Sequence, residues 1–212
     1  TEASESTRTA TFTPGRDAAR KEASKLNVPR IGVRFRLPAS MNQVEYFGRG
    51  PAENYLDRNA GSMVGLYKST AEELYFPYVR PQENGHHTDT RWVSLSTGKK
   101  GLLIQADNTI GFNALRNSIE DFDDEEATGL SRQWSNFTPE QVANHDEAAA
   151  KNVLRRQHHI NDITPRDFVE VCVDLKQQGV AGYDSWGSRP EPAYTLPANR
   201  EYNWGFTLIP LK

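Results

Sequence analysis

Cysteine is almost absent from this chain, which contains a single one, Cys172, in 212 residues. One thiol excludes an internal disulfide framework and any zinc site built from several cysteines. Cys172 lies in the apolar run VEVCV at 169–173, and burial in apolar surroundings raises the pKa of a thiol and makes it unreactive. We therefore predict a small buried side chain at this position rather than a reactive thiol.

The chain also lacks an excess of positive charge and any long apolar run. Its 25 Lys and Arg residues against 28 Asp and Glu give a net charge of −3 and a pI of about 6.0. Nucleic-acid-binding domains usually carry clustered basic residues, so we expect no nucleic-acid partner. No apolar run approaches the ~18 residues of a membrane-spanning helix, so no membrane partner is expected. No signal peptide is recognisable, and the first residue, Thr1, suggests either processing or a piece of a longer protein.

Alternation of apolar and polar residues indicates an all-β fold. Between residues 30 and 38 the two kinds of side chain alternate and Pro38 ends the run, which is the pattern of a strand with one buried face. Similar segments predict strands at 8–13, 43–47, 64–68, 90–95, 101–106, 112–115, 168–175 and 201–208. Turn signals between many short strands are typical of an antiparallel β-sandwich. We expect a polar, poorly structured lead-in at 1–27, with one possible edge strand, and a sandwich domain at 28–212.

One short helix is expected. A capping box at 138–141, with proline at the first helical position, precedes the Ala-rich segment 142–153. The acidic run at 121–126 is interpreted as a solvated loop, because a calcium loop needs alternating ligands and a central glycine.

Two Glu-Asn pairs, at 53–54 and 83–84, lie in turn-rich segments. Taken alone, Glu53 and Glu83 are candidates for the two carboxylates of a glycosidase, one a proton donor and the other a base or nucleophile. Both lie among Arg, Asn and Tyr residues, which keep a carboxylate ionised and hydrogen-bonded. We favour structural side chains that fix the loops. This expected structural set is Glu53, Asp57, Arg58, Glu83 and Asn84.

Two pairs of adjacent histidines, at 86–87 and 158–159, raise the question of a metal site. Adjacent residues on a strand point to opposite faces, so neither pair can easily chelate a metal through both rings. No metal site is expected in this chain.

The segment GVAGYDSWGSRP at 179–190 follows one expected strand and precedes another. Its glycines permit unusual backbone angles, and the Asp-Ser pair at 184–185 can brace a turn through side-chain hydrogen bonds. Trp186 either offers a flat face to a sugar ring, anchors a protein partner, or packs within the loop itself. The residues alone leave these alternatives open.

Four of these motifs occur in a recognisable order: VPRIG at 28–32, YFGRGPAENYLDR at 46–58, YVRPQENG at 78–85 and DSWG at 184–187. With them the chain resembles the C-terminal domain, or small chain, of the large bacterial β-galactosidases of glycoside hydrolase family 2. The resemblance covers about residues 28–210. It implies an antiparallel supersandwich of the galactose-mutarotase-like class. Since the family's domain begins further upstream, the first part of that sandwich is expected to lie outside this chain, and the exposed edge would favour self-association.

The resemblance also implies where the chemistry lies. The two catalytic glutamates would belong to a separate (β/α) barrel, so none is expected in this chain. Trp186 would reach over that barrel and stack on the sugar, without transferring protons. The residues expected to support its loop are Asp184, Ser185 and Gly187.

Two main functions remain to be compared at this point. The first is the sandwich domain of a retaining β-galactosidase that hydrolyses terminal β-D-galactosides such as lactose; the alternative is a free-standing carbohydrate-binding or mutarotase-like module. A purely structural domain with Trp186 buried is a third option. The expected partners are the rest of the enzyme, a galactoside and further copies of the enzyme. No cofactor is expected in this chain, and any Mg²⁺ or Na⁺ would belong to the parent enzyme. The residues do not decide between the bacterial cytoplasm and periplasm.

Overall fold

The computed structural model describes residues 6–12, 26–122, 159–184 and 187–212, the first of these as backbone alone. The strands are β1 (Ser6–Phe12), β2 (Arg30–Pro38), β3 (Gln43–Gly50), β4 (Met63–Thr70), β5 (His87–Ser96), β6 (Gly101–Leu115), β7 (Phe168–Gln177) and β8 (Tyr202–Leu211). Three short 3-10 helices are η1 (Ile119–Asp121), η2 (Ile160–Asp162) and η3 (Pro192–Tyr194). The described part of the chain is all-β, as the alternation predicts.

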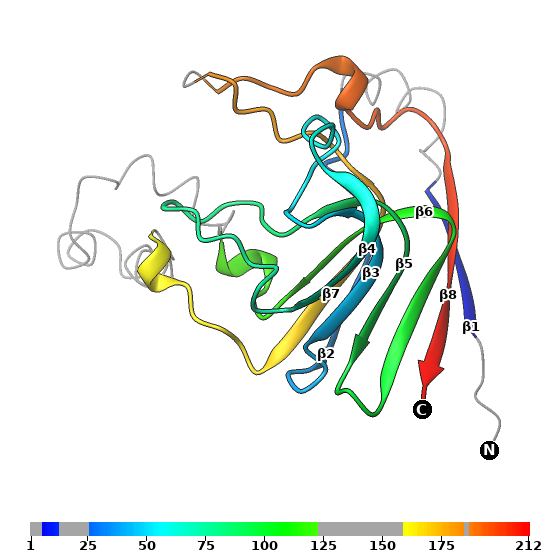
Figure 1. Cartoon of the computed structure of the whole chain (residues 1–212). Helices are drawn as coiled ribbons and strands as arrows, with labels where there is room; N and C mark the ends of the chain where they lie inside the picture. The colour runs from blue at the N-terminus through cyan, green and yellow to red at the C-terminus, as the bar shows by residue number, and fades with distance from the viewer. Residues whose placement is uncertain (1–5, 13–25, 123–158, 185–186) are drawn as a thin grey trace, which may run out of the picture.

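Strand β6 lies at the centre of one antiparallel sheet. One edge of β6 pairs with β5, and the sheet continues through β3 to β4. On the other edge, residues 101–106 of β6 pair with β8, whereas residues 111–115 pair with β7. The sheet therefore divides into two branches, β8-β1 and β7-β2, which lie apart in Figure 1.

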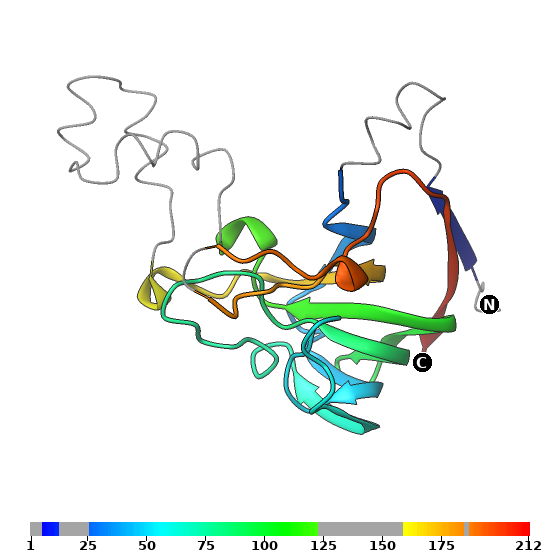
Figure 2. The same ribbon diagram turned by 90° about the horizontal axis from the view of Figure 1, so that it is seen from above.

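The change of partner along β6 coincides with a register shift. Thr90 of β5 pairs with Ile110, whereas Trp92 pairs with Gln105, so β6 contains extra residues between these points. Extra residues in one strand of an antiparallel pair bend that strand and increase its twist. The bend lets the two halves of β6 serve two branches, and Figure 2 shows the resulting curved sheet from above.

Burial along the strands follows the sequence pattern. In β2 the apolar positions Val33, Phe35 and Leu37 pack against the core, and the intervening arginines are exposed. Strand β7 is buried without interruption from Val169 to Asp174; its nearly continuous apolar run predicts this burial, and the buried range also includes Glu170 and Asp174. The core between the curved parts of the sheet contains large, fully buried side chains, among them Tyr46, Leu95, Ile104, Phe112 and Phe206.

One expectation about the strands is wrong, others are confirmed, and some concern residues that the structure does not describe. The separate strand expected at 112–115 is wrong, because these residues are the end of β6. The strand expected near 8–13 is present as β1, which pairs with β8 over its whole length. Cys172 is buried, which confirms the small buried side chain expected there, and burial raises the pKa of its thiol to about 12. The helix expected at 138–153 lies outside the described residues, as do residues 123–126 of the acidic run.

Candidate functional site

Glu53 is the centre of a hydrogen-bonded cluster in the loop after β3. Its carboxylate accepts hydrogen bonds from the Tyr55 hydroxyl (3.2 Å), Arg58 Nη2 (2.9 Å), the Gly85 N–H (2.7 Å) and the Tyr78 hydroxyl. The side chain is only 6% exposed. A carboxylate whose oxygens accept this many hydrogen bonds is held in place, which suits a structural anchor.

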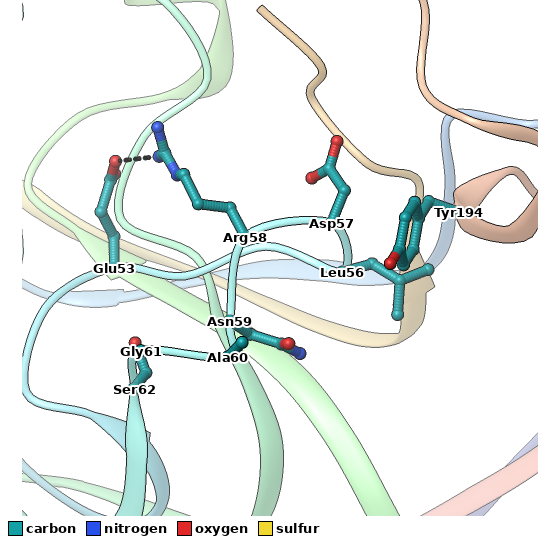
Figure 3. A pocket seen from close by; sticks show the side chains of 9 residues that line it. All are labelled: Glu53, Leu56, Asp57, Arg58, Asn59, Ala60, Gly61, Ser62 and Tyr194. Atoms are coloured by element: carbon teal, nitrogen blue, oxygen red, sulfur yellow. Dashed lines mark hydrogen bonds and ion pairs between the residues drawn. The ribbon is translucent and has the colours of Figure 1, made fainter. Parts of the chain in front are cut away.

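An open surface cleft of about 400 Å³ lies beside this cluster (Figure 3). The turn at 53–62 forms most of its wall, and Tyr194 of η3 lies across from Leu56. Arg58 lies at the cleft with half of its side chain exposed, and its guanidinium is 5.1 Å from the centre of the Tyr55 ring. The cleft marks the place where the turn after β3 meets the segment that follows β7.

The two Glu-Asn pairs use their asparagines in the same way. Asn54 donates to the Arg49 carbonyl (3.1 Å) and accepts the Thr88 N–H (3.0 Å). Asn84 donates to the Phe76 carbonyl (2.6 Å) and accepts the N–H of the same residue (2.9 Å). Each buried amide thereby satisfies backbone groups, those of Asn54 at the ends of β3 and β5 and those of Asn84 at Phe76, which fixes the loop that carries the asparagine.

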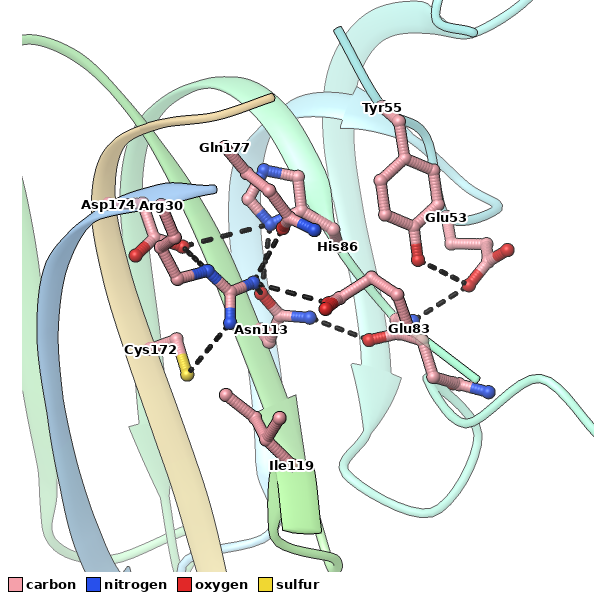
Figure 4. A network of polar contacts seen from close by, with 12 residues as sticks. Arg30, Glu53, Tyr55, Glu83, His86, Asn113, Ile119, Cys172, Asp174 and Gln177 are labelled. Atoms are coloured by element: carbon pink, nitrogen blue, oxygen red, sulfur yellow. Dashed lines mark hydrogen bonds and ion pairs between the residues drawn. The ribbon is translucent and has the colours of Figure 1, made fainter. Parts of the chain in front are cut away.

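Glu83 contacts Arg30 of β2, the centre of a polar network that reaches Glu53 through the 84–85 backbone (Figure 4). Arg30 Nη2 donates to Glu83 Oε1 (3.3 Å), Asn113 Oδ1 (2.9 Å) and the Gln177 side chain. Its Nε lies 3.1 Å from Oδ2 of Asp174, which is 1% exposed. This contact has the distance of an ion pair without the geometry of a hydrogen bond. Burial raises the pKa of Asp174, and Arg30 opposes that shift.

The two histidines at 86–87 are buried next to this cluster. His86 Nδ1 lies 2.8 Å from Asn113 Oδ1, and burial lowers the pKa of His86 to about 3. Burial also lowers the pKa of His87, whose ring packs against Tyr46 and Phe112. Both rings are therefore neutral at pH 7 and belong to the packed interior. Within the described ranges, no group of three or more His, Cys, Asp and Glu side chains is placed to hold a metal ion.

Asp57 connects the turn after β3 to the loop after β7. Its two carboxylate oxygens accept the N–H groups of Val180 (3.1 Å) and Ala181 (2.7 Å). Gly179 packs so closely on Asp57 that a Cβ atom there would lie 2.5 Å from the carboxylate. Sequence reasoning placed Asp57 in the structural set but did not connect it to this loop, because the partners are backbone groups far away in the chain.

The loop at 179–190 is described apart from two residues. Trp186, the residue expected to stack on the sugar, lies outside the described residues. Ser185, one of the residues expected to support its loop, also lies outside them. The glycines at 182 and 187 have φ angles of 88° and 82°, the unusual backbone angles that their positions predict. Asp184 Oδ1 accepts the N–H of Ser188 (3.2 Å), so this aspartate braces the turn.

The structure thus places the expected structural set on two loops that one polar network joins. Glu53, Asp57 and Arg58 share one turn, whereas Glu83 and Asn84 lie on the following loop, where Glu83 faces Arg30. Sequence reasoning missed Arg30, His86, Asn113 and Asp174. For Arg30 and Asp174 the available signal was a charged residue within a strand, since a buried charge needs a partner, but β2 and β7 each contain three charged residues, so the pattern did not single these two out.

Removing either of two charged groups should destabilise the chain measurably. We expect Glu83→Gln to lower the free energy of unfolding by about 1–2 kcal/mol, since Arg30 loses a charged partner. We expect Arg58→Ala to lower the free energy of unfolding by about 1 kcal/mol, because the Arg58 side chain is more exposed. Thermal melts and urea titrations measure both changes. Lys68→Ala is the control, because its exposed pair with Glu45 should contribute less than about 0.5 kcal/mol. Unchanged melting together with lost sugar binding would instead indicate a ligand site.

The architecture and these clusters define an antiparallel, sandwich-type β domain whose motif residues fix surface loops. The family model for the β-galactosidase small chain matches residues 3–208, so the chain belongs to that family. Within the described residues, no helix combines the length and apolar character needed to cross a membrane.

Curated relatives agree with this family. A β-galactosidase of Priestia megaterium (strain DSM 319 / IMG 1521) is 35% identical over 185 residues, which are 87% of this chain and 15% of the relative. One from Arthrobacter sp. (strain B7) is 40% identical over 111 residues, 50% of this chain and 11% of the relative. One from Vibrio cholerae is 29% identical over 181 residues, 85% of this chain and 14% of the relative. The chain therefore spans about 15% or less of the length of these relatives.

Proposed function

We propose that this chain is the sandwich domain of a retaining β-galactosidase that hydrolyses terminal β-D-galactosides such as lactose. The observation that carries the proposal is the family match over residues 3–208, together with the small share of each β-galactosidase relative that the chain spans. The catalytic carboxylates would lie on a separate barrel in the rest of the polypeptide. The engagement of Glu53 and Glu83 with neighbouring arginines supports this division.

The domain would contribute Trp186 to the sugar site. An indole stacks on the apolar face of a sugar ring and orients it without taking part in proton transfer. The described parts of its loop support this role, since Asp184 and Gly187 shape the turn on either side. The other expected partners are the remaining domains and further copies of the enzyme. Any Mg²⁺ or Na⁺ would bind in those other domains.

Trp186→Ala in the full-length enzyme tests this role. Stacking is worth about 0.5–1.5 kcal/mol beyond the buried area, so KM for lactose should rise by about 2- to 12-fold at a tenfold change per 1.4 kcal/mol. Competition between water and a sugar acceptor should shift toward water. Steady-state kinetics with and without added glucose measures both effects, and Trp186→Phe, which keeps an aromatic face, should retain most of the affinity. An unchanged KM in Trp186→Ala would contradict the proposal.

A further inference from the structure

Strand β4 forms an open edge of the sheet. Among the described residues it pairs on one side only, with β3, and it is the outermost strand on its side of the sheet in Figure 2. Its register with β3 runs from end to end without a bulge, and it contains no proline and a single charge, Lys68. Bulges, prolines and charges are the usual features that keep a sheet edge from pairing with another strand. Strand β4 therefore presents a regular edge that can accept a further strand.

The face of β4 that is turned away from the core is apolar. Val64 and Leu66 are 40% and 58% exposed, and Leu66 lies opposite Phe47 of β3, which is 38% exposed. Tyr67, on the other face of the strand, packs against the core. Exposed apolar side chains that lie together mark an interaction surface, whereas isolated ones need no explanation. The apolar row adds a hydrophobic contact beside the open edge.

The edge strand β2 differs from β4 in both respects. Among the described residues it too pairs on one side only, with β7. Its exposed positions carry Arg34 and Arg36, and its register with β7 is interrupted after Ile31. Charged side chains and irregular pairing both disfavour the addition of another strand. The protection that β2 has is missing from β4.

A second copy of the chain fits the β4 edge by symmetry. When two identical strands pair antiparallel about a two-fold axis, the residue on the axis lies opposite itself and its neighbours pair crosswise. Directly opposite residues of an antiparallel pair share one face of the sheet. With Gly65 on the axis, Val64 of each copy lies opposite Leu66 of the other, so exposed apolar side chains meet one another. With Leu66 on the axis, Val64 would instead meet the charged Lys68.

The charges of the strand are compatible with the register about Gly65. Lys68 would lie opposite Ser62 of the second copy, and its amine stays 3.3 Å from the Glu45 carboxylate of its own chain. Like charges are therefore not brought opposite one another in the paired segment. On the inner face, the exposed Met63 would meet Tyr67 of the second copy, which is a favourable contact between a thioether and a ring. A foreign strand would need its own matching apolar row, which a second copy already has.

We propose that β4 is the surface through which this chain binds a second copy of itself, with the two β4 strands paired antiparallel about Gly65. The two sheets would join into one across the axis, and each copy would cover the open edge and the apolar row of the other. Because a two-fold interface uses the same surface of both copies, association ends at the dimer.

Sedimentation of the purified chain over a series of concentrations tests the association. We expect an equilibrium between monomer and dimer. Leu66→Lys should raise the dissociation constant at least about tenfold, because every dimer would then hold two added charges in its apolar row. Val79→Lys is the matched control, since Val79 is also exposed but lies outside β4, and it should leave the constant unchanged. Thermal melts should show both variants folded, because both side chains are exposed.

Disulfide cross-linking tests the register. Directly opposite residues of an antiparallel pair have Cα atoms about 4.5–5.5 Å apart, which is within the range of a disulfide. An equal mixture of Val64→Cys and Leu66→Cys chains should therefore form a cross-linked dimer under mild oxidation. Each variant alone should form much less, because its two cysteines lie out of register. The native thiol, Cys172, is buried and gives little background.

Three results would overturn the proposal. The first is a chain that stays monomeric at about 0.5 mM, which would leave another domain of the longer enzyme as the occupant of the edge. The second is a dimer that Leu66→Lys leaves intact or that Val79→Lys weakens equally. The third is cross-linking of either cysteine variant alone to the extent of the mixture. None of these measurements involves a sugar, so their outcome is independent of the proposed galactosidase function.

Discussion

The isolated chain is expected to give no hydrolysis of a chromogenic galactoside above a buffer blank. Retaining glycosidases need two carboxyl groups about 5–5.5 Å apart, one of which attacks the sugar. The two candidate glutamates of the described chain are committed elsewhere: Glu53 accepts four hydrogen bonds and Glu83 faces Arg30. Neither is free to act as a nucleophile. The expected loss relative to the whole enzyme is therefore complete.

A time course with purified chain at high concentration measures this, and the full-length enzyme serves as the positive control. Trace contamination with a host galactosidase is the main alternative source of turnover, so Glu53→Gln and Glu83→Gln chains should be purified in the same way. Turnover that disappears in either variant would show that this domain carries catalytic carboxylates, and the proposed division of labour would then be wrong.

The largest loss of stability is expected from Arg30→Ala. This change leaves Asp174, which is 1% exposed, without the cation that faces it at 3.1 Å. Removing one partner of a buried ion pair typically costs about 3–5 kcal/mol. Arg30 also bonds Glu83, Asn113 and Gln177, so three further side chains lose a donor. Urea denaturation of the chain should show a lower midpoint, or no folded baseline at all.

Two further variants separate the buried charge from a general loss of packing. Arg34→Ala changes the same residue type on the same strand, but its bond to Glu120 is exposed and should contribute at most about 1 kcal/mol. Arg34 also lies 3.6 Å from the buried Glu170, which keeps Arg36 as a partner at 3.0 Å in this variant. Adding Asp174→Asn to Arg30→Ala should recover part of the loss, since a neutral amide costs less to bury than an unpaired carboxylate. Equal losses in Arg30→Ala and Arg34→Ala would contradict this account.

Local pattern was enough to predict most of the strands. Alternation of side chains along a strand has a period of two, so residues 30–38 and 201–208 show their buried face directly in the sequence. The nearly continuous apolar run of β7 likewise indicates a strand buried on both faces. The same reasoning divided β6 in two, because a weakly apolar stretch within a bent strand looks like a turn between two strands.

The motifs predicted which segments matter but not what each side chain contacts. Four ordered motifs were enough for the family, and the glycines of the 179–190 loop predicted its positive φ angles. In contrast, Arg30 meets Asp174, and Asp57 meets the Val180 and Ala181 N–H groups, across more than a hundred residues of chain. No local pattern records such a pairing.

The sequence by itself therefore determined the all-β class, the limits of most strands and the family. Only the folded structure shows that Glu53 pairs with Arg58 whereas Glu83 pairs with Arg30, and that one carboxylate holds the start of the loop proposed to carry the sugar-stacking residue. The physical reason is that strand formation depends on neighbours along the chain, whereas burying a charge depends on whichever groups the folded sheet brings within about 3–4 Å.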